Sequence, residues 1–256
     1  WFHNNGTKWY NHGDCIGNRN VAWISGGIEK DGYIHWSQPE IVLYDDNHYR
    51  GPSYPDLIIE DGEYYISATQ KTRAAIHKID SDLIKDLWKQ KEVKQVTEDG
   101  LIYEANNKKG LKETDIKSKE LPSLKDGGGF SLDMWLSFAN FAPGQTIIDN
   151  RNQNQKGFYV EVNSDKNLEI VLNDGFMEAS WNFSTDLLKT DKKHNIVIIV
   201  DGGPKIISFV IDGKFYDGGS NRPFGWGRFS PYFRNVSSSE KIRLAPSFKG
   251  ELLSLR

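Results

Sequence analysis

Short segments in which apolar and polar residues alternate dominate the chain, and this period of two predicts β-strands. A first group lies between residues 20 and 80, where turns rich in Gly, Asp and Pro separate the segments. Its members are residues 21–25 (VAWIS), 40–44 (EIVLY), 57–60 (LIIE), 63–69 (EYYISAT) and 73–79 (RAAIHKI). Asp61-Gly62 separates the third member from the fourth, and this dipeptide predicts a tight hairpin turn.

Two stretches depart from this pattern. Residues 81–88 (SDLIKDLW) place four apolar side chains at helical spacing, which predicts a short helix with Ser81 as its N-cap. Lys and Glu then crowd residues 89–126, a composition that predicts a solvated connector with one strand at residues 100–104.

From Phe130 onward one strand follows another, with Gly, Asp and Asn at the turns. Residues 195–201 (NIVIIVD) form a continuous apolar run, as in a strand that is buried on both faces or lies at the centre of a sandwich. Trp135 and Trp181 lie mid-strand, so we expect both in the core. Strands at such regular spacing without helices predict a sandwich or jelly roll. The other predicted strands are residues 130–138, 157–162, 168–172, 177–183, 206–211, 242–244 and 251–255.

These patterns predict an all-β protein in two parts. We expect an N-terminal region over residues 1–105, a connector over 106–126 and a β-sandwich over 127–256. Trp1 at the start and the apolar alternation at the end look like cuts through structure, so we expect a piece of a longer protein.

Composition excludes several functional classes. The formal net charge of −3 gives no electrostatic attraction to nucleic acid or to an anionic membrane. No segment approaches the roughly 20 apolar residues of a membrane span. Cys15 is the single cysteine, so an intrachain disulfide is impossible. The aromatic fraction of 12% and the 24 glycines suit sheets joined by many turns.

Three segments of the C-terminal part carry a resemblance to the laminin-G/concanavalin A-like superfamily. They are GGFSLDMWLSF (128–138), TIIDNRNQNQKGFYVEV (146–162) and HNIVIIVDGG with IISFVIDGKFYDGG (194–219). The resemblance implies a jelly roll. It implies no single function, because such domains bind glycans or proteins, or have no known ligand.

Two segments of the N-terminal part, DGYIHWSQPEIVLY (31–44) and SYPDLIIEDGEYYISATQ (53–70), resemble the later blades of sialidase-like (BNR-type) propeller glycosidases. The region is long enough for about two blades, whereas a closed ring needs at least about four. The remaining blades would come from a missing N-terminal part or from another chain. The resemblance implies catalytic roles for Tyr54 as nucleophile, Glu40 as its polarising carboxylate, and Arg73 or Arg50 as a clamp for a substrate carboxylate.

A phenol is a poor nucleophile at neutral pH unless a nearby carboxylate takes its proton, which is the role that Glu40 would serve for Tyr54. The structural alternative is that Tyr54 stacks on Pro55 in a blade core while Glu40 caps a turn. Arg73 would then form a salt bridge between blades.

Other polar residues near strand ends are candidates for binding sugar hydroxyls. They are Gln38, Asp56, Gln70 and Lys71, with Arg50 as a further substrate-binding candidate. Trp226, in the Gly-rich segment FGWGRF, would stack on a sugar face if exposed, or pack against the sheet if buried.

The sequence predicts no cofactor and no metal site. His35, His48 and His77 match no compact ligand spacing. Asp14, Asn18 and Asn20 supply oxygen atoms without the spacing of a calcium loop, so calcium stays only as an alternative.

The sequence therefore predicts part of a secreted or periplasmic glycosidase, sialidase-like and acting on a polysaccharide or glycoconjugate, with a jelly-roll accessory module. Two alternatives remain: a non-catalytic module that recognises glycan or protein, and a jelly roll that only braces the propeller.

Overall fold

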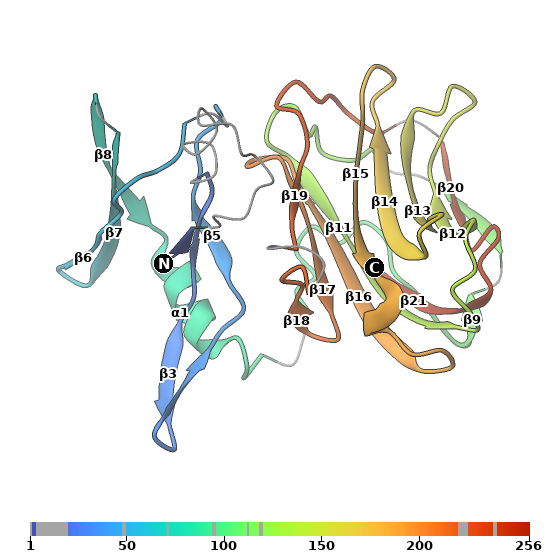
Figure 1. The fold of residues 1–256 in the computed structure, drawn as a ribbon, viewed down its shortest axis with the longest axis horizontal. Helices are drawn as coiled ribbons and strands as arrows, with labels where there is room; N and C mark the ends of the chain where they lie inside the picture. The colour runs from blue at the N-terminus through green and yellow to red at the C-terminus, as the bar shows by residue number, and fades with distance from the viewer. Residues whose placement is uncertain are drawn as a thin grey trace. The chain divides into compact units, whose positions relative to one another are not determined.

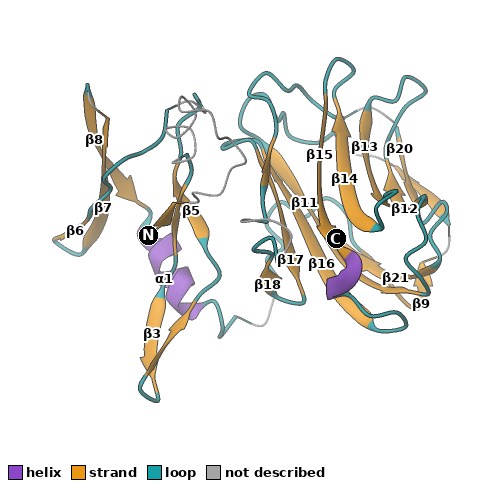
Figure 2. Cartoon of the chain, viewed as in Figure 1, coloured by secondary structure: helices purple, strands orange, loops and turns teal. Residues whose placement is uncertain are grey.

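The computed structural model describes residues 2–3, 20–47, 50–70, 72–93, 96–111, 113–117, 120–219, 225–237 and 240–256. The chain divides into two compact units, Trp1–Thr97 and Glu98–Arg256, and each has a hydrophobic core of its own (Figure 1). Strands supply most of the regular structure in both units, which confirms the all-β prediction (Figure 2). The described residues contain no helix that is long and apolar enough to span a bilayer.

The first unit contains three small antiparallel sheets among its described residues. Asp61 and Gly62, with φ angles of 51° and 80°, form the predicted hairpin turn between β6 and β7. The sheets are β1 (Phe2–His3), β2 (Ala22–Ile24) and β5 (Glu40–Leu43); β3 (Gly27–Lys30) and β4 (Tyr33–Trp36); and β6 (Leu57–Glu60), β7 (Glu63–Gln70) and β8 (Arg73–Ile79). No closed ring is formed by these described strands, and the assignment to propeller blades stays a prediction.

The helix α1 (Ser81–Lys89) forms where the sequence predicts it, but its N-cap is Asp80 rather than Ser81. The Asp80 carboxylate accepts the backbone N–H of Asp82 at 2.8 Å, a bond that Ser81 cannot make from inside the helix. Ile84 and Leu87 are the buried residues of α1, and they join the sheet residues of the unit's core.

The second unit is a sandwich of two antiparallel sheets. One contains six strands in the order β10-β20-β12-β13-β14-β15, and the other contains β18-β17-β16-β11-β21-β9 with β19 paired to β17. The bounds are β9 (Ala105–Leu111), β10 (Thr114–Lys117), β11 (Gly129–Phe138), β12 (Gln145–Asp149), β13 (Gly157–Val162), β14 (Asn167–Asn173), β15 (Glu178–Ser184), the 3₁₀ turn η2 (Thr185–Leu187), β16 (Lys193–Asp201), β17 (Ile206–Ile211), β18 (Lys214–Phe215), β19 (Gly227–Arg228), β20 (Lys241–Leu244) and β21 (Gly250–Leu255).

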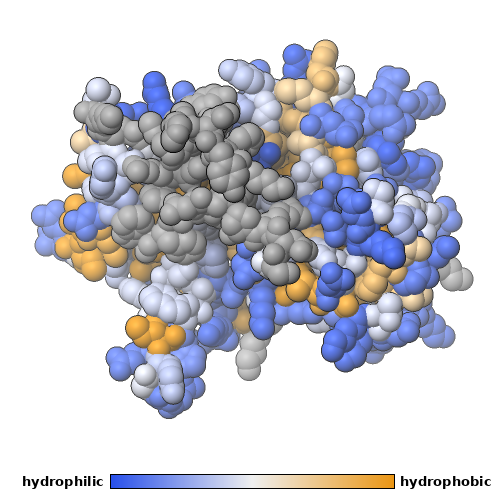
Figure 3. Space-filling view, in the orientation of Figure 1, coloured by the Kyte–Doolittle hydropathy of each residue, from blue (hydrophilic) through white to orange (hydrophobic). Residues whose placement is uncertain are grey.

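The core of this unit lies between its two sheets. Phe183 of β15 and Phe209 of β17 come from different sheets, and their ring centroids are 5.2 Å apart in an edge-to-face arrangement. In β16, Ile196, Ile198 and Val200 are buried while the intervening residues are half-buried, which fits a central strand. Hydrophilic side chains cover most of the sandwich surface in the space-filling view (Figure 3).

Residues 106–126, expected as a connector, instead contain β9 and β10, and these strands pair with β21 and β20. Both are edge strands, where charged side chains such as those of Lys108 and Lys109 remain in solvent, so their composition resembles a linker. Residues 100–104, expected as a strand, form none, and β9 begins directly after them at Ala105.

Trp135 corrects a core prediction. Its side chain is 47% exposed, because Met134, Leu136 and Phe138 of β11 take the buried side of the strand and alternation places Trp135 on the other. Trp181, also expected in the core, is half-buried and packs against the core without belonging to its buried residues.

Replacing Phe209 with Ala removes a fully buried ring from the contact between the sheets. We expect the free energy of unfolding of the second unit to fall by about 3–5 kcal/mol, as for other core Phe-to-Ala changes. Urea denaturation followed by circular dichroism measures it. Leu187→Ala, at a position that is 49% exposed, is the control and should change stability by less than about 0.5 kcal/mol. An equal effect of the two changes would contradict this role of Phe209.

Candidate functional site

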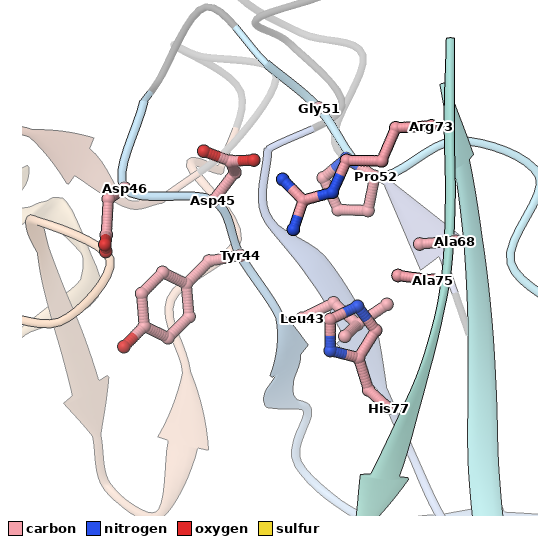
Figure 4. A pocket seen from close by; sticks show the side chains of 10 residues that line it. All are labelled: Leu43, Tyr44, Asp45, Asp46, Gly51, Pro52, Ala68, Arg73, Ala75 and His77. Carbon is pink, nitrogen blue, oxygen red and sulfur yellow. The ribbon is translucent and has the colours of Figure 1, made fainter. Parts of the chain in front are cut away.

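A cavity of about 380 Å³ in the first unit contains one of the three predicted catalytic residues, Arg73. Arg73, Ala75 and His77 lie on one face of β8, and Ala68 of β7 is the pairing partner of Ala75. The side chains of Arg73 and His77 point towards the segment that follows β5 (Figure 4). That segment and its surroundings supply the opposite wall, with Leu43, Tyr44, Asp45, Asp46, Gly51 and Pro52.

The cavity has groups of both hydrogen-bonding kinds. Arg73 supplies guanidinium donors, and Asp45 and Asp46 supply carboxylate acceptors. Tyr44 adds an aromatic ring on the side opposite His77 (Figure 4). Such a wall can hold a small polar ligand that presents oxygen atoms.

Tyr54 and Glu40 do not line this cavity. The Tyr54 side chain is 77% exposed, and its backbone has a φ of 48°, in the left-handed region that bulky residues rarely adopt. Glu40 begins β5, where it is paired with Ile24 and exposed. The structure therefore leaves their proposed partnership as a prediction.

The predicted substrate-binding residues lie at separate places in the first unit. The backbone N–H of Gln38 donates a hydrogen bond to Gln90 Oε1 at 2.6 Å. The backbone N–H of Asp56 donates to Ser67 Oγ at 3.0 Å, and that of Arg50 donates to the Asn47 carbonyl at 2.8 Å. Gln70 ends β7. Lys71, His48, Asp14 and Asn18 lie outside the described residues.

Trp226 is only 4% exposed, so its ring has little surface to offer a sugar. The Arg228 guanidinium lies 5.9 Å from the Trp226 ring centroid, and burial lowers the pKa of Arg228 to about 10. Packing requires glycine at the neighbouring position 227, because an added Cβ there would lie 2.3 Å from the ring of Trp181.

No three His, Cys, Asp or Glu side chains in the described part of the chain are placed to hold a metal ion. Asn20, considered for calcium, is buried, and its side-chain amide donates to the Asp45 carbonyl at 2.6 Å.

A second polar cluster lies on the solvent-facing side of the six-stranded sheet, and sequence reasoning missed it. We call it the sheet-face cluster. Register places its members on the adjacent strands β20, β12, β13 and β14, with Arg151 just beyond β12. It consists of Asp149, Arg151, Tyr159, Glu161, Glu169 and Arg243.

Asp149 is the centre of this cluster. Its side chain is only 4% exposed. Oδ2 accepts hydrogen bonds from Arg151 Nη2 at 2.8 Å and from Arg243 Nη2 at 2.6 Å, while Oδ1 accepts from Arg151 Nε at 3.0 Å. Burial by itself would raise the pKa of Asp149, but the hydrogen bonds from Arg151 and the charges of both arginines outweigh it, and the pKa is lowered.

An aromatic ring and two carboxyl groups continue the cluster across the sheet. The Arg151 guanidinium carbon lies 3.8 Å from the ring centroid of Tyr159, a cation–π contact. Glu161 is the direct cross-strand partner of Glu169. Burial raises the pKa of Glu161, and the negative charge of Glu169 raises it further by a smaller amount.

Glu169 is held on the sheet by two amides. Asn163 Nδ2 donates to Glu169 Oε2 at 3.2 Å, and Asn182 Nδ2 donates to Oε1 at 3.4 Å. The cluster thus offers guanidinium donors, carboxylate acceptors and an aromatic ring on one surface, and hydrogen bonds to neighbours hold Asp149, Arg151 and Glu169 in place. The alternation in residues 157–162 indicates that Tyr159 and Glu161 share a face, but no sequence signal pairs Asp149 with Arg243.

Replacing Asp149 with Asn removes the charge that two guanidinium groups share. We expect the free energy of unfolding near neutral pH to fall by about 1–2 kcal/mol, because the buried carboxylate loses charge-assisted hydrogen bonds while both guanidinium groups keep contact with solvent. Because the folded-state pKa is lowered, the stabilisation by Asp149 is complete above the unfolded value of about 3.9 and is lost as the pH falls through the folded value.

The difference between wild type and Asp149→Asn should therefore shrink below about pH 4. Urea denaturation over a pH series measures this, with Asp165→Asn on an exposed turn as the matched control. A difference that stays constant across the series would contradict the role given to the Asp149 charge.

Solved structures similar to this chain share little sequence with it, and no curated protein matches it. The CBM40 of the Ruminococcus gnavus IT-sialidase, bound to alpha2,3 sialyllactose, is 11% identical with a TM-score of 0.40, over 57% of this chain and 90% of that one. Galectin LEC-6 of Caenorhabditis elegans is 13% identical with a TM-score of 0.39, over 60% and 94%. Domains LG4-5 of the mouse laminin alpha1 chain are 11% identical with a TM-score of 0.37, over 59% and 39%.

One family model matches the sequence directly. Laminin_G_3, described as the concanavalin A-like lectin/glucanases superfamily, matches residues 112–254. The match covers more than half of the chain and falls within the unit of two facing sheets, so the jelly-roll part of the sequence resemblance is confirmed. The chain belongs to the concanavalin A-like lectin/glucanases superfamily.

Proposed function

We propose that this protein binds glycans through the sheet-face cluster. The observation that carries the proposal is a single solvent-facing surface on which Asp149 holds two arginines beside the Tyr159 ring and the Glu161–Glu169 pair. A sugar ring presents hydroxyl groups, which both donate and accept hydrogen bonds, around faces of apolar C–H groups. Binding sites for such molecules combine a few oriented polar groups with aromatic surface.

Pre-orientation supports the proposal. Binding weakens when flexible side chains must be ordered, at a cost of about 0.5–1.5 kcal/mol for each long side chain. Arg151 already bonds Asp149 at both Nε and Nη2, and Glu169 already accepts from two asparagines. A ligand would therefore meet a surface whose polar groups are largely fixed.

The Glu161–Glu169 pair can both accept and donate hydrogen bonds to a ligand. Burial and the negative charge of Glu169 raise the pKa of Glu161, so Glu161 keeps its proton to a higher pH than an exposed glutamate does and, when protonated, can donate a hydrogen bond.

The double variant Glu161→Gln/Glu169→Gln tests this proposal. We expect roughly tenfold weaker glycan binding near neutral pH, because hydrogen bonds to ionised carboxylates are about twice as strong as those to amides. Binding of the 256-residue chain to a printed array of neutral and acidic oligosaccharides, followed by calorimetry on the best ligand, gives the affinity.

Glu251→Gln is the matched control, since Glu251 is an exposed glutamate on β21 of the other sheet. It should bind glycan as the wild type does. Glycan binding that is equal in all three proteins would refute the sheet-face cluster, and an array without any bound glycan would refute the function itself.

We propose as a second function that the natural protein containing this chain is a glycoside hydrolase, sialidase-like, that acts on a polysaccharide or glycoconjugate. Two observations favour it: the left-handed backbone of the exposed Tyr54, and the cavity that contains Arg73. Strained backbone at a non-glycine residue is concentrated at functional sites. Polysaccharides do not cross membranes, so we place such an activity in the secreted or periplasmic space.

Tyr54→Phe in the natural protein removes the proposed nucleophile while keeping the ring. We expect turnover of acidic or neutral chromogenic glycosides to fall by about a thousandfold or more, as for other lost nucleophiles. Tyr33→Phe is the control, because Tyr33 is 74% exposed in β4 and has no proposed role. Intact mass of the assayed protein shows whether further residues accompany this 29.2 kDa chain. Full activity in Tyr54→Phe would exclude Tyr54 as nucleophile.

A further inference from the structure

Two exposed aromatic side chains lie on loops of the jelly roll and belong to none of the sites above. Phe176, between β14 and β15, is 76% exposed, and Tyr232, between β19 and β20, is 80% exposed. Arg234 connects the two loops, since its guanidinium carbon lies 4.2 Å from the ring centroid of Phe176. We call Phe176, Tyr232 and Arg234 the aromatic loop pair.

A buried carboxylate holds these loops together. Asp174 is only 2% exposed. Its Oδ1 accepts the backbone N–H groups of Phe176 and Met177 at 2.8 and 2.7 Å, and its Oδ2 accepts that of Arg234 at 2.8 Å. Burial would raise the pKa of Asp174, but these three backbone hydrogen bonds and the charge of Arg234 lower it. The display of Phe176 beside Arg234 is therefore built into the fold.

Polar side chains lie close to the Phe176 loop. Asn173 Nδ2 donates to Glu178 Oε2 at 3.4 Å on one side of the Phe176 loop. On the other side the stem of Lys156 passes beside Gly175, where an added Cβ would lie 3.7 Å from Lys156 Cδ. An interface with a protein usually needs a broad area with an apolar centre, about 800 Å² on each partner. An exposed ring stacked on a guanidinium, with polar side chains on the same loop, suits a small amphipathic ligand better.

We propose that the aromatic loop pair is a second glycan-contacting site, on which a sugar ring stacks while Arg234 donates hydrogen bonds to its oxygen atoms. The inference rests on the proposed glycan binding by the sheet-face cluster and adds the length of the ligand. Residues 150–156 connect the two places, because Arg151 belongs to the cluster and Lys156 borders the aromatic loop. The natural ligand is then an oligosaccharide chain that reaches both sites rather than a single sugar.

The test compares affinity with ligand length. Calorimetry is run with cello-, xylo- and galacto-oligosaccharides and oligogalacturonides of two to six sugar units, on wild type and on Phe176→Ala/Tyr232→Ala. We expect the double variant to bind the longer members about tenfold or more weakly, as for loss of two aromatic contacts, and the shortest members unchanged. The single variant Phe176→Trp, which keeps an aromatic face at this position, should bind the longer members nearly as tightly as the wild type does.

Leu187→Ala, a loss of exposed apolar surface elsewhere in the same unit, should leave every affinity unchanged. Unchanged thermal unfolding confirms that the double variant is folded, as expected for two side chains that make few buried contacts. Equal affinity of wild type and double variant for all lengths would overturn the inference, while weaker binding by Glu161→Gln/Glu169→Gln would still support the sheet-face cluster. Absence of binding in the wild type would overturn both.

Discussion

Burial of one side of every strand between the two facing sheets determines where all other side chains of the jelly roll are placed. Once Phe158 and Val160 of β13 are buried, Tyr159 and Glu161 must lie on the solvent side. The same rule places Asp149 and Arg243 on that side from the neighbouring strands. Ion pairs at a surface contribute little by themselves. Apolar packing therefore decides which polar groups can meet, and the ion pairs then orient the groups that have been brought together.

The first unit follows the same rule, but it has far fewer apolar side chains to bury. Small sheets of two or three strands are marginal unless another layer covers their apolar face. The helix α1 supplies Ile84 and Leu87 to such a layer, against Ile66, Ile79 and Leu43. Arg73 and His77 lie on the same face of β8 as the buried Ile79, so this face changes from polar to apolar along the strand. The cavity lies where this covering ends and polar side chains replace the core.

Local patterns in the sequence predict those elements whose structure depends on interactions between residues that are close in the chain. The alternations at 157–162 and 206–211, the Asp61-Gly62 turn and the short helix are of this kind. The prediction for Trp135 was wrong because a tryptophan in an alternating strand does not reveal which of the two faces is buried. The strands β9 and β10 escaped notice because edge strands need few apolar residues.

The candidate sites were harder to predict because they depend on register. Asp149 and Arg243 lie far apart in the chain, and only the pairing of β12 with β20 makes them neighbours. Asp174 and the backbone of Arg234 meet for the same kind of reason, across two loops. Tyr54 shows the reverse situation: the resemblance identifies it from the sequence, and its left-handed φ is a second, independent feature of the same residue.

The position of β9 has a consequence for how this domain should be delimited. The family match begins at residue 112, after β9 has ended at Leu111. A domain cut at that boundary would lose the strand that pairs with β21, and β21 would then present unpaired backbone N–H and C=O groups along its length. Open strand edges recruit other chains by forming intermolecular sheets. The residues of β9, whose composition resembles that of a linker, therefore protect β21 from pairing with another chain. A domain shortened at residue 112 would be expected to self-associate although the sheet-face cluster and the aromatic loop pair were both present.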